Sequence, residues 1–151
     1  MIKYRRFQFG WVIVVTFIAF IVWMTFAYIY QWGNNPIDTY GYILFLIIFV
    51  GVLLFYYRMT IIVTDRYIKI KFGIGLYTIK IDLAAISSVT VQKYPLYYGY
   101  GIRIIPKGLL YNVNGKHALE IKLKDKKKVI QIGSNYWDNL KNSIEENISK
   151  N

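Results

Sequence analysis

The sequence predicts an α+β protein in two parts, an apolar helical hairpin over residues 1–57 and, over 58–151, an antiparallel β-barrel or sandwich capped by a C-terminal helix. Two observations predict this division. The hydrophobic fraction of the 151 residues is 56%, above the roughly 45–50% of soluble globular chains, and the excess lies before residue 58. After that point, apolar and polar residues alternate in short runs, as in strands with one buried face.

Two stretches without charged residues predict two membrane-spanning helices. The first covers about residues 9–30 and would form a helix about 33 Å long, enough to cross a hydrocarbon core of about 30 Å. The second covers residues 40–57 and reaches about 27 Å, near the short end of workable spans. The first apolar run is longer than the roughly 7–15 residues of a signal-peptide core. We therefore expect a hairpin that stays in the bilayer.

Basic residues flank the hairpin at one end only. Lys3, Arg5 and Arg6 precede the first span and Arg58 follows the second, whereas the loop at 31–39 has no basic residue. Because basic residues beside membrane helices stay in the cytoplasm, we expect a multi-pass protein of the cell membrane with both termini cytoplasmic. The sequence has no cysteine, which excludes disulfides but does not decide the compartment.

Period-two alternation predicts eight strands after the hairpin, for example Ile68, Ile70 and Phe72 against Lys69 and Lys71. The expected strands cover residues 59–64, 67–72, 76–82, 87–93, 101–105, 109–113, 118–124 and 129–133. Short connectors join the first four, which we expect to form a meander.

The chain then ends in an expected amphipathic helix. Its apolar stripe consists of Trp137, Leu140, Ile144 and Ile148. The strands and this helix together suggest a small curled sheet plugged by the helix.

Antiparallel strands closed by a C-terminal helix resemble a pleckstrin-homology domain. Within them, the run GYGIRIIPKGLLYNVNGKHALEI, residues 99–121, is similar to a motif of small prokaryotic membrane proteins. In those proteins a transmembrane hairpin precedes a bacterial pleckstrin-homology-like domain. The resemblance implies a fold and a membrane setting but no activity. Recognition of inositol lipids does not follow from it, because bacterial members of this fold are not generally readers of those lipids.

Few residues could support catalysis. His117 is the single histidine, so without cysteine a transition-metal site would depend on carboxylates almost alone. The eight acidic residues are scattered, and only Glu145 and Glu146 are adjacent, on the polar side of the last helix. They offer no carboxylate pair for acid–base chemistry, and the GIG and GYG runs lack the spacing of phosphate loops. We expect a protein that is not an enzyme and has no catalytic residue, metal or cofactor.

The basic charge of the second part is consistent with solubility next to an anionic leaflet or with binding. Residues 58–151 include sixteen basic and seven acidic residues, a net charge of about +9. An acidic protein partner and anionic lipid both fit this excess. Nucleic acid is not expected, because the aromatic residues do not interleave with the basic ones.

Strand direction separates the turns into two ends. Alternation from the second span places the turns at 73–75 and 94–100 near the membrane and the turn at 65–66 away from it. Tyrosine suits the interface because its ring is apolar and its hydroxyl polar. The alternative is that some of these rings cover the end of the sheet as core. The expected membrane-interface residues are Ile74, Tyr94, Tyr97, Tyr98 and Tyr100.

Two basic clusters are candidate binding surfaces. By the pleckstrin-homology resemblance, the lysine-rich loop lies with the 65–66 turn, at the end far from the membrane. The candidate surface for an acidic partner there consists of Arg66, Lys126, Lys127 and Lys128. The candidate contacts to lipid headgroups, near the tyrosine loop, are Arg58, Lys93 and Arg103.

The expected function is a non-enzymatic, membrane-anchored adaptor or assembly module that binds a protein partner through its cytoplasmic domain. An exposed strand edge could also receive an extended peptide. The first alternative is a sensor of anionic lipid headgroups at the inner leaflet. The second is a subunit whose hairpin is the interaction surface, although neither span contains the GxxxG pattern of close helix packing.

Overall fold

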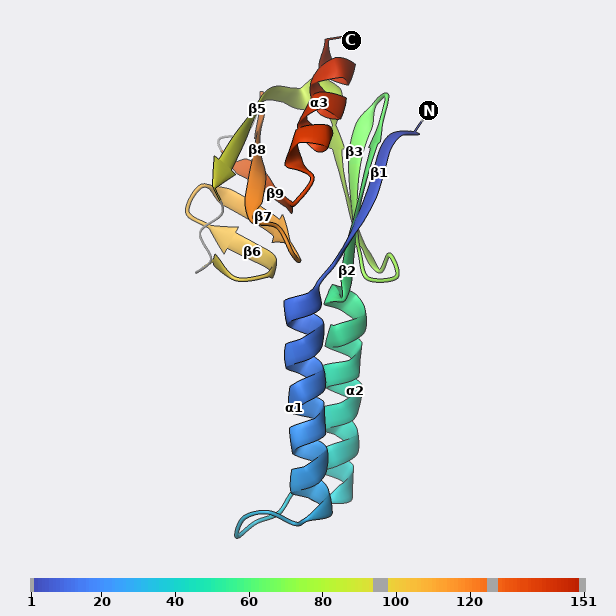
Figure 1. Ribbon diagram of the computed structural model, residues 1–151, viewed down its shortest axis with the longest axis vertical. Helices are drawn as coiled ribbons and strands as arrows, with labels where there is room; N and C mark the ends of the chain where they lie inside the picture. The colour runs from blue at the N-terminus through green and yellow to red at the C-terminus, as the bar shows by residue number, and fades with distance from the viewer. Residues whose placement is uncertain (1, 94–97, 125–127, 150–151) are drawn as a thin grey trace.

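The computed structural model describes residues 2–93, 98–124 and 128–149. A helical hairpin forms one end of the molecule, and two β-sheets with a C-terminal helix form the other (Figure 1). The fold class is α+β, as the sequence predicts.

The hairpin consists of α1 (Trp11–Ile29) and α2 (Thr39–Tyr56), close to the expected ranges. Aromatic rings join the two helices: the ring centroids of Phe20 and Phe49 are 5.2 Å apart. The hydroxyls of Thr25 and Tyr42 share a hydrogen bond of 2.9 Å. Neither helix has a buried residue, and both are long and apolar enough to cross a membrane.

The first sheet has the strand order β1-β2-β3-β4, with every pair antiparallel. Its strands are β1 (Ile2–Phe9), β2 (Arg58–Thr64), β3 (Tyr67–Phe72) and β4 (Tyr77–Asp82). The sequence analysis did not anticipate β1, which precedes α1 and pairs with the strand that follows α2. A division of the chain at residue 58 therefore separates β1 from its own sheet.

The second sheet has the order β5-β8-β9-β7-β6, and β7 runs parallel to β9. Its strands are β5 (Ile86–Lys93), β6 (Gly101–Ile105), β7 (Gly108–Asn112), β8 (His117–Leu123) and β9 (Val129–Ser134). The expected four-strand meander is wrong at its last strand, because β5 leaves the first sheet after a 3-10 turn at Leu83–Ala85 and pairs with β8. The described strands form two sheets, so the expected single curled sheet is also wrong.

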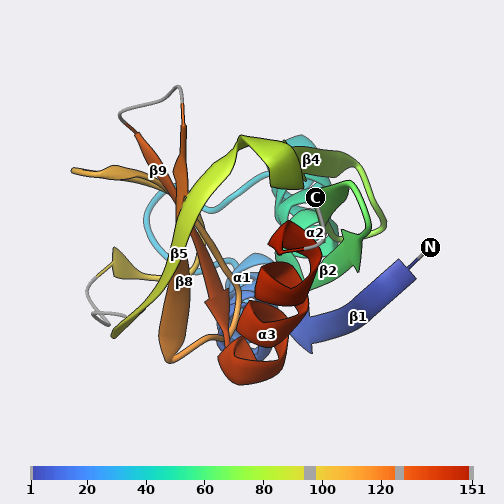
Figure 2. The same cartoon turned by 90° about the horizontal axis from the view of Figure 1, so that it is seen from above.

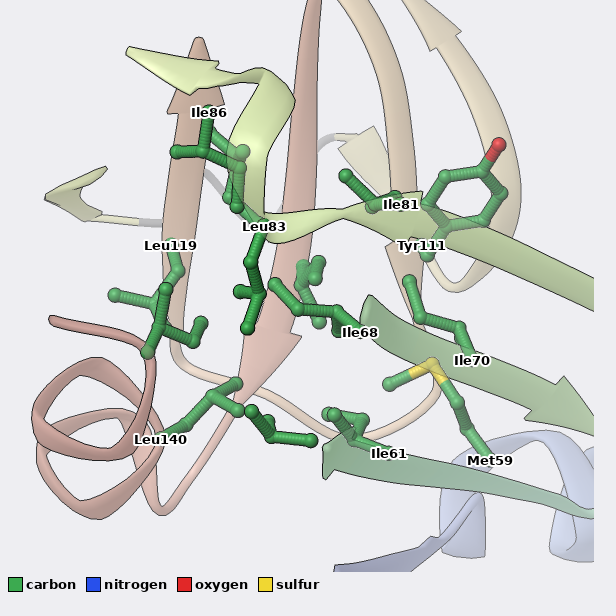
Figure 3. Packing of buried hydrophobic residues seen from close by; sticks show 14 of the residues in the cluster. Met59, Ile61, Ile68, Ile70, Ile81, Leu83, Ile86, Tyr111, Leu119 and Leu140 are labelled. Carbon is green, nitrogen blue, oxygen red and sulfur yellow. The ribbon is translucent and has the colours of Figure 1, made fainter. Parts of the chain in front are cut away.

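The core lies between the two sheets and α3 (Trp137–Ile148). Seen from above, α3 lies between the sheets (Figure 2). Figure 3 shows Met59 and Ile61 of β2 with Ile70 of β3, Leu119 of β8 and Leu140 of α3, all fully buried. Each such side chain contributes about 1.5–3 kcal/mol of hydrophobic stabilisation. The predicted stripe of α3 is confirmed: Leu140 and Ile144 are buried, and Trp137 and Ile148 pack against the same core.

Candidate interaction surfaces

The turn at residues 73–75 lies against the end of α2. Gly73 has a positive φ of 56°, and its N–H donates to the carbonyl of Arg58 at 2.8 Å. A Cβ at Gly73 would collide with the carbonyl oxygen of Leu54, so glycine is required for this close approach. The side chain of Ile74 is 64% exposed at the tip. This turn is therefore next to the hairpin, where strand alternation places it.

The two described tyrosines of the 94–100 loop, Tyr98 and Tyr100, lie in different environments. Tyr94 and Tyr97 lie outside the described residues. Tyr98 is half-buried and packs against a small cluster of Ile105, Leu110 and Ala118, so its ring covers the end of a core. Tyr100, also half-buried, lines a cavity at the end of the hairpin.

The far end of the domain contains Arg66. This exposed residue is in the β2–β3 turn, and its carbonyl accepts a hydrogen bond of 2.8 Å from the N–H of Leu83. The N–H of Lys124 donates to the carbonyl of Ala85 at 2.9 Å, which brings the end of β8 to the same place. Lys128 is exposed, and Lys126 and Lys127 lie outside the described residues.

The three candidate headgroup residues stand on three different strands. Arg58 begins β2 of the first sheet. Lys93 ends β5 and Arg103 is in β6, and β5 and β6 are the two opposite edge strands of the second sheet. The Nε of Arg58 donates to the carbonyl of Gly73 at 3.0 Å. The structure thus groups Arg58 with the turn of Ile74 and groups Arg103 with Tyr100, whose carbonyl accepts from the Arg103 Nε at 3.2 Å.

A larger basic surface covers the outer side of the first sheet. Ile61, Ile68 and Ile70 point into the core, so the alternate positions of these strands face away from it. Strand register then brings cations from all four strands together: Arg5 and Lys69 both pair with Ile62, and Lys69 pairs with Lys80. The set, called the basic face below, consists of Arg5, Arg58, Lys69, Lys71 and Lys80.

The basic face has a shallow hollow with a volume of about 500 Å³. Arg5, Arg58 and Lys71 line it, and Thr60 and Ile62 contribute to its floor. Like charges gathered over one surface create a potential that attracts anions. The hollow is therefore suited to an acidic group.

The acids of the first sheet lie at its far end. Asp82 pairs with Tyr67, and a carboxylate oxygen of Asp65 is 3.6 Å from the Nζ of Lys3. Arg6 also lines the hollow, but it is left out of the basic face because its guanidinium lies over the ring of Tyr136, 4.9 Å from the ring centre. Sequence alternation marks the lysines of the basic face, but Arg5 joins them only through the unpredicted strand β1.

Glu120 and Tyr111 are titratable groups buried inside the β domain. Glu120 is buried and accepts a hydrogen bond of 3.0 Å from the Nε2 of Gln131. The pKa of Tyr111 is raised to about 12, mainly by burial and in smaller part by repulsion from Tyr77 and a hydrogen bond with it. Within residues 2–93, 98–124 and 128–149, no group of three His, Cys, Asp or Glu side chains could hold a metal ion.

No protein-family model, curated protein or solved structure matches this chain.

Proposed function

We propose that the protein is a non-enzymatic, membrane-anchored adaptor. In this proposal the hairpin spans the cell membrane, and the cytoplasmic β domain holds an acidic segment of a protein partner on the basic face. The two sheets and the C-terminal helix support a pleckstrin-homology-like domain, with β1 and the parallel β7–β9 pair as departures from a simple meander.

The surface of the hairpin supports membrane insertion. Val15 and Ile47 are 61% and 66% exposed, and both helices are apolar on all sides. A soluble protein rarely exposes an apolar patch of more than a few hundred Å², whereas a bilayer accepts such a surface. The basic flanks of the hairpin support a cytoplasmic domain.

Height above the bilayer favours a protein partner over lipid headgroups. Arg58 stands at the end of α2, and Lys71 pairs with Thr60 about 7 Å further along β2. The row of Arg5, Lys69 and Lys80 lies about 13 Å beyond Arg58. The headgroup layer is only about 5–8 Å thick per leaflet. With the hairpin inserted in this way, three of the five cations would lie above the headgroups, and their distance from the hairpin along the strands is the observation that supports the proposal.

A binding measurement with the full chain tests the proposal. The protein is placed in phosphatidylcholine nanodiscs, and a fluorescent glutamate-rich peptide is titrated by anisotropy. The double variant Lys69→Glu, Lys80→Glu should weaken binding at least about tenfold and reduce its salt dependence. The matched control, Arg66→Glu with Lys128→Glu, makes the same charge change at other exposed positions and should bind nearly as well as the wild type.

The reverse result has a clear meaning. Loss of binding in the control pair, with the basic-face pair unaffected, would move the binding surface to the far end of the domain. Equal binding by all three proteins would contradict the adaptor proposal.

Arg58 and Lys71 support a second, weaker role as contacts to anionic headgroups, because their positions are at headgroup height. Replacing both by glutamine should weaken peptide binding in neutral nanodiscs less than the double variant at Lys69 and Lys80 does. In liposomes with anionic lipid, it should reduce the protection of Ile74 from water, measured with a fluorophore at that position. Unchanged protection would remove this second role.

A further inference from the structure

Two hollows follow one side of the hairpin downward from β6. The upper one has a volume of about 370 Å³ and lies between the helices and the segment from Tyr100 to Arg103. The lower one has a volume of about 650 Å³ and reaches Trp23 along α1. Thr16 and Phe17 line both hollows, so the two adjoin along α1; together they are called the hairpin groove below.

The length and lining of the hairpin groove suit one acyl chain. From Val12 to Trp23 the groove follows eleven residues of α1, about 16 Å. One leaflet contributes about half of a hydrocarbon core of about 30 Å. Apart from Thr16, the helix side chains along it are hydrocarbon or aromatic, so ordered water would find few partners there.

A cation stands at the upper mouth of the groove. Arg103 lines the upper hollow, and the bond from its Nε to the carbonyl of Tyr100 orients the guanidinium. The remaining N–H groups form the planar fork that suits a phosphate. Figure 1 shows β6 in the part of the second sheet that lies nearest to the hairpin, with the end of β7 beside it.

Gly101 makes this position of Arg103 possible. Its φ is +100°, and a Cβ there would lie 3.2 Å from the Cε1 of Tyr56. The start of β6 therefore rests directly on an aromatic ring of α2. This contact places a phosphate-binding side chain at the depth where the hairpin meets the headgroups.

We propose that the hairpin groove binds one phospholipid of the adjacent leaflet, with an acyl chain along α1 and the phosphate on Arg103. The inference rests on the proposed membrane insertion and is independent of the basic face. The bound lipid links the second sheet to the bilayer, because no described strand of that sheet is joined directly to α1 or α2.

Photolabelling of the full chain tests the inference. The protein is reconstituted in nanodiscs that contain a phosphatidylcholine analogue with a photoreactive diazirine on one acyl chain, and labelled peptides are identified by mass spectrometry. Labels should concentrate on the groove side of α1. Arg103→Gln should lower this labelling about tenfold, and Ala19→Trp, which fills the groove, should lower it similarly. Ile47→Trp, an exposed position of α2 outside the groove, should leave it unchanged.

Contrary results separate the two proposals. Even labelling around the hairpin, unaffected by Arg103→Gln and Ala19→Trp, would show bulk lipid only and overturn the inference. Equal labelling by a diacylglycerol analogue, which lacks the phosphate, would overturn the role of Arg103. Failure of the wild-type protein to enter nanodiscs would overturn membrane insertion itself, and the inference with it.

Discussion

The two sheets meet the hairpin in different ways. In the first sheet, β1 leads directly into α1, and α2 leads directly into β2. Where the strands meet the helices, the N–H of Gly10 donates to the carbonyl of Tyr57 at 2.8 Å. In the second sheet, no described strand is joined directly to α1 or α2, and Gly101 rests on the ring of Tyr56. Chain connectivity therefore fixes the distance of the basic face from the hairpin, whereas side-chain packing positions the second sheet.

Removal of β1 should have the largest effect on the first sheet. Deletion of residues 2–9 leaves β2 as an exposed edge and removes the buried Gln8, whose Nε2 donates to the carbonyl of Gly133 at 3.0 Å. We expect the first sheet to lose cooperative folding and the domain to aggregate or be proteolysed. Limited proteolysis of the protein in detergent measures this effect. A domain equally resistant with and without residues 2–9 would show that β1 is dispensable.

Phe72 ties both sheets to the hairpin. Its ring lies 6.1 Å from Tyr111 of the second sheet and 6.2 Å from both Phe55 and Tyr56 of α2. Because Phe72 is fully buried, Phe72→Ala should lower the free energy of unfolding by about 3–5 kcal/mol. Phe7→Ala, on the outer side of β1 and 68% exposed, should change it by less than about 0.5 kcal/mol. Urea unfolding in micelles compares them, and similar losses would contradict the assigned packing.

Alkaline pH should destabilise the second sheet through Tyr111. Its folded-state pKa is about 12, mainly because of burial, whereas an unfolded tyrosine titrates near 10. The neutral phenol is thus favoured in the folded state, and its contribution is present below pH 10 and lost as pH rises toward 12. The loss should be on the order of 2 kcal/mol at most. Unfolding curves of Tyr111→Phe should lack this part of the pH dependence, and parallel curves for both proteins would contradict the assignment.

The elements of the fold follow from local pattern. Charge-free runs locate both hairpin helices, period-two alternation locates the expected strands, and an apolar stripe at helical spacing locates α3, because each signal lies within a few residues. The turn of Ile74 near the hairpin follows from strand direction in the same way.

The partners of the strands depend on contacts between distant residues. Residues 2–9 contain three cations and look like the positive flank of a membrane span, and β1 is a strand only because β2 returns beside it after the hairpin. β5 has the same alternation as its predecessors, and its move to the second sheet depends on its pairing with β8. The basic face does not follow from local sequence pattern, because its cations come from four strands that only strand pairing brings together.

Cysteine labelling tests whether the hairpin crosses a membrane and leaves the β domain on the cytoplasmic side. The protein has no native cysteine, so Asn35→Cys in the loop between the helices and Thr78→Cys on the outer side of the first sheet give unique probes. In intact cells, we expect a membrane-impermeant maleimide to label Asn35→Cys and to label Thr78→Cys only after permeabilisation. Labelling of Thr78→Cys in intact cells, or equal accessibility of both positions, would contradict the account.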